Sequence, residues 1–320
     1  MKILLAIVLA AVLLILAVGI YIFNFTFYNS PKKRRDPDSY RSDPFYQDHL
    51  EQITAGIDAL KTLPCEDVEI LSEEGRRLHG RYYEQKPGAP VALLMHGYRG
   101  HAFGDFCGRF DVVRSLGFNI LLIDERACGD SDGRVISFGI RERKDGLSWI
   151  NYILCRFGEE TEICLFGVSM GAATVMMMLG LEDLPENVKA VVEDCGYTSP
   201  RAVIRSVAEK NGFPVDLMYP LCRASARVLG GFDIEAASPI DAVRKTKVPI
   251  LFIHGEDDDF VPFPMCGELY EACASEKKML TVPRAGHAKA YLQDGEAWSK
   301  AVREFLRGRF HGLPETEDRT

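Results

Sequence analysis

The sequence predicts an α/β fold: a mostly parallel eight-stranded sheet with helices on both faces, a small helical lid and an N-terminal transmembrane helix. Three observations predict it. From residue 65 onwards, short apolar runs alternate with segments of helical spacing. Several of these runs are apolar throughout, as in parallel strands that are covered on both faces. The chain also begins with a long uninterrupted apolar segment.

Length, charge and cysteine content narrow the class of protein. A chain of 320 residues, 47% of them hydrophobic, can bury a sizeable core. The net charge of -8 argues against a nucleic-acid partner, which favours a basic stripe. The nine cysteines are odd in number and scattered, without the spacing of a disulfide framework or a zinc site. We therefore expect buried thiols in a reducing compartment.

The apolar N-terminal segment predicts an uncleaved membrane anchor over residues 1–28. Residues 3–23 are apolar throughout, and a helix needs about 20 such residues to cross a bilayer. A cleaved signal peptide is the alternative, but its apolar region is usually about 7–15 residues long and ends in small residues. Aromatic residues close the segment, as in an interfacial belt: Tyr21, Phe23, Phe25, Phe27 and Tyr28.

Basic residues predict the orientation of this anchor. Lys32, Lys33, Arg34 and Arg35 follow the apolar segment, whereas Lys2 and the terminal amine precede it. The positive-inside rule then places the C-terminal domain in the cytoplasm. We expect a single-pass protein of the plasma membrane.

Changes in composition divide the rest of the chain. Residues 29–63 are predicted to be a basic juxtamembrane linker with a short helix, and residues 64–312 form the α/β domain. The alternation stops at about residues 198–238, which have helical patches but no strand, so this segment is predicted to be a lid. Residues 313–320 are predicted to be a polar tail. The basic linker is interpreted as a stop-transfer flank, with attraction to anionic lipid as the alternative.

Each strand is predicted from a short apolar run bounded by turn residues. The predicted strands cover residues 68–71, 78–83, 91–95, 119–123, 162–166, 188–192, 248–253 and 278–282. Apolar residues spaced three and four apart predict the helices between them. These helices lie near residues 53–60, 103–113, 147–154, 172–179, 264–274 and 298–306.

The pentapeptide Gly-Val-Ser-Met-Gly at residues 167–171 is the motif with the clearest chemistry. It lies between a predicted strand and a predicted helix, the context that a nucleophile elbow requires. The turn is too sharp for side chains at its flanks, hence Gly167 and Gly171. Ser169 is thus predicted to project above the sheet as a nucleophile, with a chance turn as the alternative.

A serine hydroxyl needs a base, and that base needs an orienting carboxylate. His287 follows the last predicted strand, and the loops after parallel strands meet at one edge of a sheet. Four consecutive acids, residues 256–259, follow the preceding strand, and spacing alone does not choose among them. The chain order of serine, acid and histidine is that of one known hydrolase arrangement.

Two backbone N–H groups are expected to bind the oxyanion that forms on the substrate. One is the N–H of Met170, the residue after the nucleophile. The other is the N–H of Tyr98, in the His-Gly-Tyr-Arg-Gly loop that follows the strand at residues 91–95. His96 is given only a supporting role in this loop.

These motifs together resemble the α/β-hydrolase superfamily, and most closely the serine aminopeptidase S33-like and Bem46-like hydrolases, including anchored bacterial members. The resemblance covers about residues 65–310. It is carried by Met-His-Gly-Tyr-Arg-Gly at 95–100, Asp-Glu-Arg-Ala-Cys-Gly-Asp-Ser at 124–131, the elbow, and His-Gly-x-x-Asp-x-x-Val-Pro at 254–262.

The resemblance implies which carboxylate orients the base. In that family the acid follows His-Gly-x-x, which selects Asp258. Some superfamily members place the acid after an earlier strand, where this chain has Asp194. The chain departs from the family at Cys128, where a histidine is common; a redox-sensitive thiol is the alternative to a supporting role there.

The sequence therefore predicts a serine hydrolase with Ser169, Asp258 and His287 as catalytic residues and Tyr98 and Met170 as oxyanion hole. Neither a cofactor nor a metal is expected. The expected substrates are small-molecule esters or other acyl compounds, lipid-derived esters among them, which a carboxylesterase or lipase would cleave. The alternatives are an S33-like peptidase or amidase, and a catalytically idle, membrane-tethered binding protein.

Overall fold

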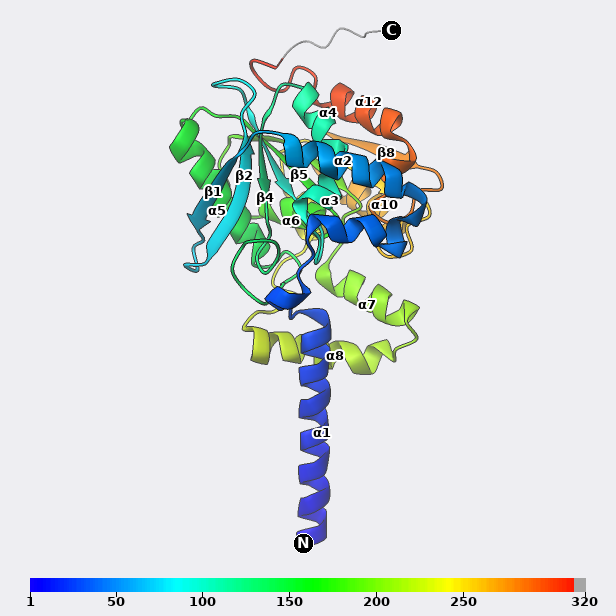
Figure 1. The fold of residues 1–320 in the computed structure, drawn as a ribbon. Helices are drawn as coiled ribbons and strands as arrows, with labels where there is room; N and C mark the ends of the chain where they lie inside the picture. The colour runs from blue at the N-terminus through cyan, green and yellow to red at the C-terminus, as the bar shows by residue number, and fades with distance from the viewer. Residues whose placement is uncertain (314–320) are drawn as a thin grey trace.

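The computed structural model describes residues 1–313, and the predicted fold class is confirmed (Figure 1). Within these residues an eight-stranded sheet has the order β1-β2-β4-β3-β5-β6-β7-β8. The pairs β1–β2 and β2–β4 are antiparallel, and the remaining pairs are parallel. The strands are β1 Glu66–Leu71, β2 Arg77–Tyr83, β3 Val91–Met95, β4 Asn119–Ile123, β5 Ile163–Val168, β6 Val188–Asp194, β7 Ile250–Gly255 and β8 Lys277–Val282.

Helices cover both faces of the sheet because alternate strand residues point to opposite sides. Leu94 and Leu122 pack under one helical layer, formed by α2 Leu50–Thr62, α3 Ala102–Phe106, α4 Arg109–Ser115 and α12 Gly295–Leu306. Leu93 and Leu121 pack under the other, formed by α5 Glu142–Phe157, α6 Met170–Met178, α9 Pro239–Val243 and α10 Pro264–Ala272. The short helix α11 Ala290–Gln293 precedes α12.

The helix predicted over residues 103–113 is broken into α3 and α4. The break falls at Cys107 and Gly108, and Gly108 has a positive φ of 77° that an α-helix does not accommodate. Each piece still buries its apolar side chains, among them Phe106 and Phe110.

The segment after the apolar helix lies against the sheet domain. It contains three 3₁₀ turns, η1 Pro31–Lys33, η2 Pro37–Ser42 and η3 Pro44–His49, before α2 begins. Tyr40 is fully buried, and Ile53 and Ile57 belong to the core beneath α2. Much of the predicted linker is therefore part of the packed domain. Of the predicted polar tail, residues 314–320 lie outside the described residues.

The N-terminal helix α1, Lys2–Thr26, projects away from the sheet domain (Figure 1). It is long and apolar enough to cross a membrane, and residues 1–17 are exposed. The helices α7 Pro200–Lys210, α8 Val215–Ser225 and the π-helical turn η4 Ala226–Gly230 lie within the predicted lid. The end of α1 packs against α8 and η4, so helices of the predicted lid separate the exposed part of α1 from the sheet (Figure 1).

Candidate active site

Ser169 stands on a sharp turn between β5 and α6. Its φ of 55° lies in the left-handed region, which non-glycine residues rarely adopt. A Cβ on Gly171 would lie 2.0 Å from the carbonyl oxygen of Met95, and a Cβ on Gly167 would lie 2.4 Å from the backbone of Gly171. The turn therefore requires both glycines, as the elbow motif predicts.

The structure brings together the three side chains that the sequence predicts. The Oγ of Ser169 lies 2.8 Å from Nε2 of His287. The Nδ1 of the same ring lies 2.7 Å from Oδ2 of Asp258. Ser169 and Asp258 are buried, and His287 is 9% exposed. The hydroxyl, imidazole and carboxylate thus form one hydrogen-bonded series at the carboxyl edge of the sheet, where the loops after β5, β7 and β8 meet.

Asp258 is held as an ionised acceptor. Its Oδ1 accepts the backbone N–H groups of Phe260 at 3.0 Å and Val261 at 2.9 Å. Burial raises the pKa of this carboxyl, but hydrogen bonds from His254 and His287 outweigh burial and hold the pKa below its usual range. An ionised carboxylate at Nδ1 favours the tautomer in which Nε2 faces Ser169 as an acceptor.

The other candidate carboxylates have different partners. Asp194 accepts from Arg109 and from the indole of Trp298, both at 3.0 Å. In the four-acid loop, Glu256 accepts from Thr281 and Asp259 pairs with Lys210. Asp257 is exposed. Among the described residues, Asp258 is therefore the carboxylate that is hydrogen-bonded to the imidazole of His287.

Arg109 connects several segments around the candidate site through hydrogen bonds, and no sequence motif predicts this role. Its guanidinium is buried and forms a salt bridge of 2.9 Å with Asp194. It also donates to the carbonyl oxygen of Ala288 at 2.9 Å and to that of Asp105 at 2.9 Å. Since Ala288 is the next residue after His287, Arg109 positions the histidine loop relative to β6.

The two predicted oxyanion donors lie in different segments, Tyr98 in the loop after β3 and Met170 at the start of α6. Within residues 1–313, the backbone N–H groups of Tyr98 and Met170 have no hydrogen-bond acceptor. The N–H of Gly97 instead donates to Oδ2 of Asp105 at 2.7 Å, and the hydroxyl of Tyr40 donates to Oδ1 at 3.0 Å. Asp105 and Tyr40 thus shape this loop, and sequence patterns gave no signal for either. The ring of His96 accepts the N–H of Glu125 at 3.0 Å, which suits a supporting role.

A cavity of about 260 Å³ opens beside Ser169. Its lining combines the site, the predicted lid and the end of α1. The lining residues include Tyr21, Phe25, Tyr98, Phe138, Ser169, Met170, Tyr197, Val207, Phe213, Met218 and Phe260. Val207, Phe213 and Met218 are among the apolar residues of the predicted lid. Val228 and Leu229, from the same set, lie outside the cavity lining and are exposed.

The four arginines of the predicted lid are paired with carboxylates. Arg205 lies 2.8 Å from Asp216, and Arg201 lies 3.7 Å from Glu235. Arg223 and Arg227 both pair with Asp233. These pairs agree with a solvated ionic surface rather than a cluster of free cations.

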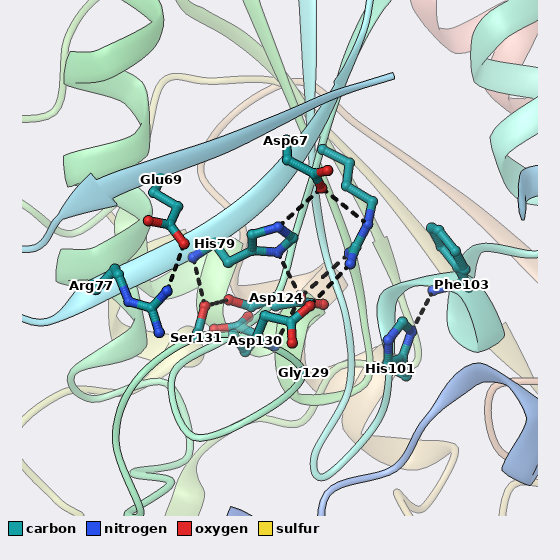
Figure 2. Close-up of polar contacts among 12 residues, drawn as sticks. Asp67, Glu69, Arg77, His79, His101, Phe103, Asp124, Gly129, Asp130 and Ser131 are labelled. Carbon is teal, nitrogen blue, oxygen red and sulfur yellow. Dashed lines mark hydrogen bonds and ion pairs between the residues drawn. The ribbon is translucent and has the colours of Figure 1, made fainter. Parts of the chain in front are cut away.

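A second polar cluster lies around His79 (Figure 2). The ring nitrogens of His79 lie 3.0 Å from Asp124 and 3.1 Å from Asp67. The hydrogen bond that His79 donates to the carboxylate of Asp124 is the main cause that raises the pKa of His79. Asp130 also lies close enough to share a cation with His79 and Asp124. However, the guanidinium of Arg81 already contacts Asp124 at 3.4 Å and Asp130 at 3.3 Å. The positive charge of Arg81 therefore balances these carboxylates without a metal ion.

Cys128, which replaces a histidine of the resembling family, is buried. Burial is the main cause that raises the pKa of its thiol well above the ordinary value. A protonated thiol is a poor nucleophile, so this environment argues against a redox-sensitive role. Cys195 lies beside Asp258 and His287, and burial raises the pKa of its thiol in the same way.

Comparison with protein families gives a match over residues 138–312, which is 175 of the 320 residues. The matching family model describes the prolyl oligopeptidase family. The matched segment contains Ser169, Asp258 and His287, whereas the loop with Tyr98 precedes it.

Two relatives and one solved structure illustrate the similarity. The chain is 28% identical over 193 residues to the uncharacterized protein YqkD of Bacillus subtilis, covering 60% of this chain but only 63% of that protein. It is 26% identical over 311 residues to the lysophosphatidylserine lipase ABHD12 of Gallus gallus, covering 89% and 74%. The esterase Pf2001 of Pyrococcus furiosus shares the fold with a TM-score of 0.63 at 21% identity, covering 77% of this chain and 91% of that one.

Proposed function

We propose that this chain, which belongs to the prolyl oligopeptidase family of α/β-hydrolases, is a membrane-anchored serine hydrolase that cleaves carboxylic esters at Ser169. One observation carries the proposal. The hydroxyl of Ser169, the imidazole of His287 and the carboxylate of Asp258 are joined by contacts of 2.8 and 2.7 Å. This is the geometry that lets a base remove the serine proton while a carboxylate stabilises the resulting imidazolium.

The reaction proceeds in two halves. Ser169 Oγ attacks the ester carbonyl while Nε2 of His287 takes its proton, and the negative charge that develops on the carbonyl oxygen is bound by the N–H groups of Tyr98 and Met170. His287 then protonates the leaving alcohol as the acyl-enzyme forms. In the second half His287 activates a water molecule, which releases the acid and restores Ser169.

The free N–H groups support the role given to Tyr98 and Met170. Met170 is the first residue of α6, so its N–H has no acceptor within the helix and adds to the positive end of the helix dipole. Asp105 and Tyr40 fix the loop that carries Tyr98, so its N–H is oriented before substrate binds. Donors held in advance cost no reorganisation during the reaction.

An ester is favoured over a peptide by the lining of the cavity. The cavity that reaches Ser169 is lined by apolar side chains, among them Phe138, Val207, Phe213 and Met218. A peptide backbone brings N–H and C=O groups that such a surface leaves unpaired, at a cost of roughly 1–3 kcal/mol each. The relative ABHD12 is a lysophosphatidylserine lipase, which supports an acyl chain as the occupant. The family match supports a peptidase or amidase as the second candidate.

The proposal includes the location of the enzyme. The length and apolar composition of α1 support an anchor in the plasma membrane, and the basic residues that follow it favour a catalytic domain in the cytoplasm. A catalytic domain held at the bilayer surface meets lipid-derived esters at high local concentration. Protease access to intact vesicles tests the orientation.

A substrate panel on the full-length protein in detergent tests the ester proposal. The panel contains p-nitrophenyl esters of two to sixteen carbons, a lysophospholipid, and aminoacyl and acylpeptide p-nitroanilides. We expect turnover of the esters, with kcat/KM at least tenfold above that of any anilide. Faster cleavage of the anilides would favour the peptidase. No turnover by a folded protein across all acyl lengths would favour the idle binding protein.

A further inference from the structure

We propose that residues 21–26, the last turns of α1, form one wall of the acyl pocket, so that the enzyme takes a single-chain amphiphilic ester directly from the bilayer. This inference rests on the proposed function and extends it to the source and shape of the substrate. It gives the membrane anchor a second role as part of the binding site.

The end of α1 lines the same cavity as the nucleophile. Tyr21, Ile22, Phe25 and Thr26 border the space that reaches Ser169. Residues of the predicted lid, among them Val207 and Met218, line the same cavity. A chain lying in this space therefore contacts the anchor and the lid while its carbonyl group lies at Ser169.

The loop that carries the predicted oxyanion donor also binds the end of α1. The hydroxyl of Tyr98 donates to the carbonyl oxygen of Thr26 at 2.7 Å. The guanidinium of Arg99 donates to the carbonyl oxygens of Phe25 and Tyr28, each at 2.9 Å. The last carbonyls of a helix have no partner within it and attract cations. The domain therefore caps the membrane helix with two adjacent side chains of its own active-site loop.

The chain just beyond α1 fixes the helix further. Phe27 is fully buried and its ring packs edge-on against Phe138 and Phe232. The carbonyl oxygen of Phe27 accepts the N–H of Ile136 at 2.9 Å. Arg34 donates to the carbonyl oxygens of Gly129, Ser131 and Gly133 at 2.7–2.8 Å. A flexible tether needs none of these contacts, so the helix has a defined place against the domain.

The geometry of a bilayer places the cavity at its surface. About 20 helical residues at 1.5 Å each span the roughly 30 Å of hydrocarbon. If residues 3–22 fill that span, residues 21–26 lie at the interface. Tyr21 and Phe25 are 65% and 62% exposed there, and Leu217 on α8 is 66% exposed. Aromatic rings are favoured at this depth, so the apolar mouth of the cavity faces lipid instead of water.

The size of the cavity indicates the class of ligand. A volume of about 260 Å³ is near the lower end for ligand pockets, which suits one acyl chain better than two. The ester group lies at Ser169, and the polar head remains outside the carbon-lined space. A lysophospholipid or another monoacyl ester fits this description.

Photo-crosslinking in vesicles tests the inference without requiring turnover. Full-length Ser169→Ala protein, which keeps the ester intact, is reconstituted in phosphatidylcholine vesicles with a lysophospholipid that carries a diazirine at the end of its acyl chain. We expect crosslinks in residues 21–26 and 203–218, suppressed by excess unlabelled lysophospholipid. Crosslinks confined to residues 3–18, unaffected by competitor, would reflect surrounding lipid and overturn the inference.

A pair of variants gives the kinetic readout. Phe25→Ala removes part of the proposed wall, whereas Leu9→Ala removes an exposed apolar side chain of the same helix outside the cavity. For a long-chain ester, Phe25→Ala should lower kcat/KM by about 10-fold or more, the usual effect of altered apolar contacts in a pocket. Leu9→Ala should stay within twofold of wild type for the long-chain ester and for p-nitrophenyl acetate. Equal chain-length profiles of wild type and Phe25→Ala overturn the inference while leaving the hydrolase intact; absent turnover in all three proteins contradicts the hydrolase.

Discussion

Replacing Ser169 by alanine should abolish ester turnover, with a loss in kcat on the order of 10⁶-fold, as in other hydrolases of this mechanism. In the proposed mechanism Ser169 forms the covalent intermediate, and its hydroxyl lies 2.8 Å from Nε2 of His287, the proposed base. The measurement is steady-state hydrolysis of a p-nitrophenyl ester by the full-length protein. The fold should persist, because a smaller side chain at residue 169 introduces no clash.

Ser148→Ala is the matched control for this variant. Ser148 lies on α5, is less buried than Ser169, and donates to the carbonyl oxygen of Lys144 at 3.1 Å. Its removal should leave kcat within twofold. A Ser169→Ala protein that keeps more than a few per cent of the wild-type rate would remove the serine from the role of nucleophile.

Replacing Asp258 by asparagine should lower kcat by on the order of 10⁴-fold, the loss expected when the orienting carboxylate becomes an amide. The amide cannot stabilise the imidazolium, and its N–H₂ group favours the wrong tautomer of His287. The same p-nitrophenyl ester assay measures the effect. Binding should change less than turnover, so the loss should appear in kcat rather than in KM.

Two further asparagine variants make this prediction specific. Asp257→Asn changes the neighbouring, exposed acid and should stay within twofold of wild type. Asp194→Asn weakens the contact with Arg109, which positions the histidine loop, and should cost less than Asp258→Asn. A larger loss for Asp194→Asn than for Asp258→Asn would contradict the assignment of the acid.

The strands and their order along the chain could be predicted because buried parallel strands leave a clear signal. Residues 91–95 and 120–123 are apolar throughout, and β3 and β4 have the predicted bounds, 91–95 and 119–123. The α/β-hydrolase superfamily is confirmed, while the Bem46-like subtype stays a prediction. The elbow was recognisable because two glycines are sterically required around Ser169.

Contacts between distant parts of the chain could not be predicted in the same way. Arg109 and Asp105 lie in a helical region with no motif, and their roles depend on where β6 and the histidine loop pass in space. Composition predicts that the basic segment after α1 is a linker. The hydroxyl of Tyr40 nevertheless donates to the buried Asp105, and Arg34 donates to several backbone carbonyls of the domain. No local sequence pattern encodes these contacts.

The relation between the anchor and the cavity is the clearest example. Composition marks α1 as a candidate membrane span, and an apolar helix has no internal feature that distinguishes a tether from a pocket wall. The hydrogen bonds from Tyr98 and Arg99 to the end of α1 are made to backbone carbonyls, so the α1 side chains carry no trace of them. Only the folded arrangement reveals that contact.

Mass-spectrometric mapping of a fluorophosphonate adduct is the most direct test of the central claim, that Ser169 is the nucleophile activated by His287. The full-length protein is treated with the reagent, digested and sequenced. The account predicts one adduct, on the peptide that contains Ser169, formed far more slowly in His287→Ala. An adduct on another residue, or equal labelling rates in the two proteins, would contradict it.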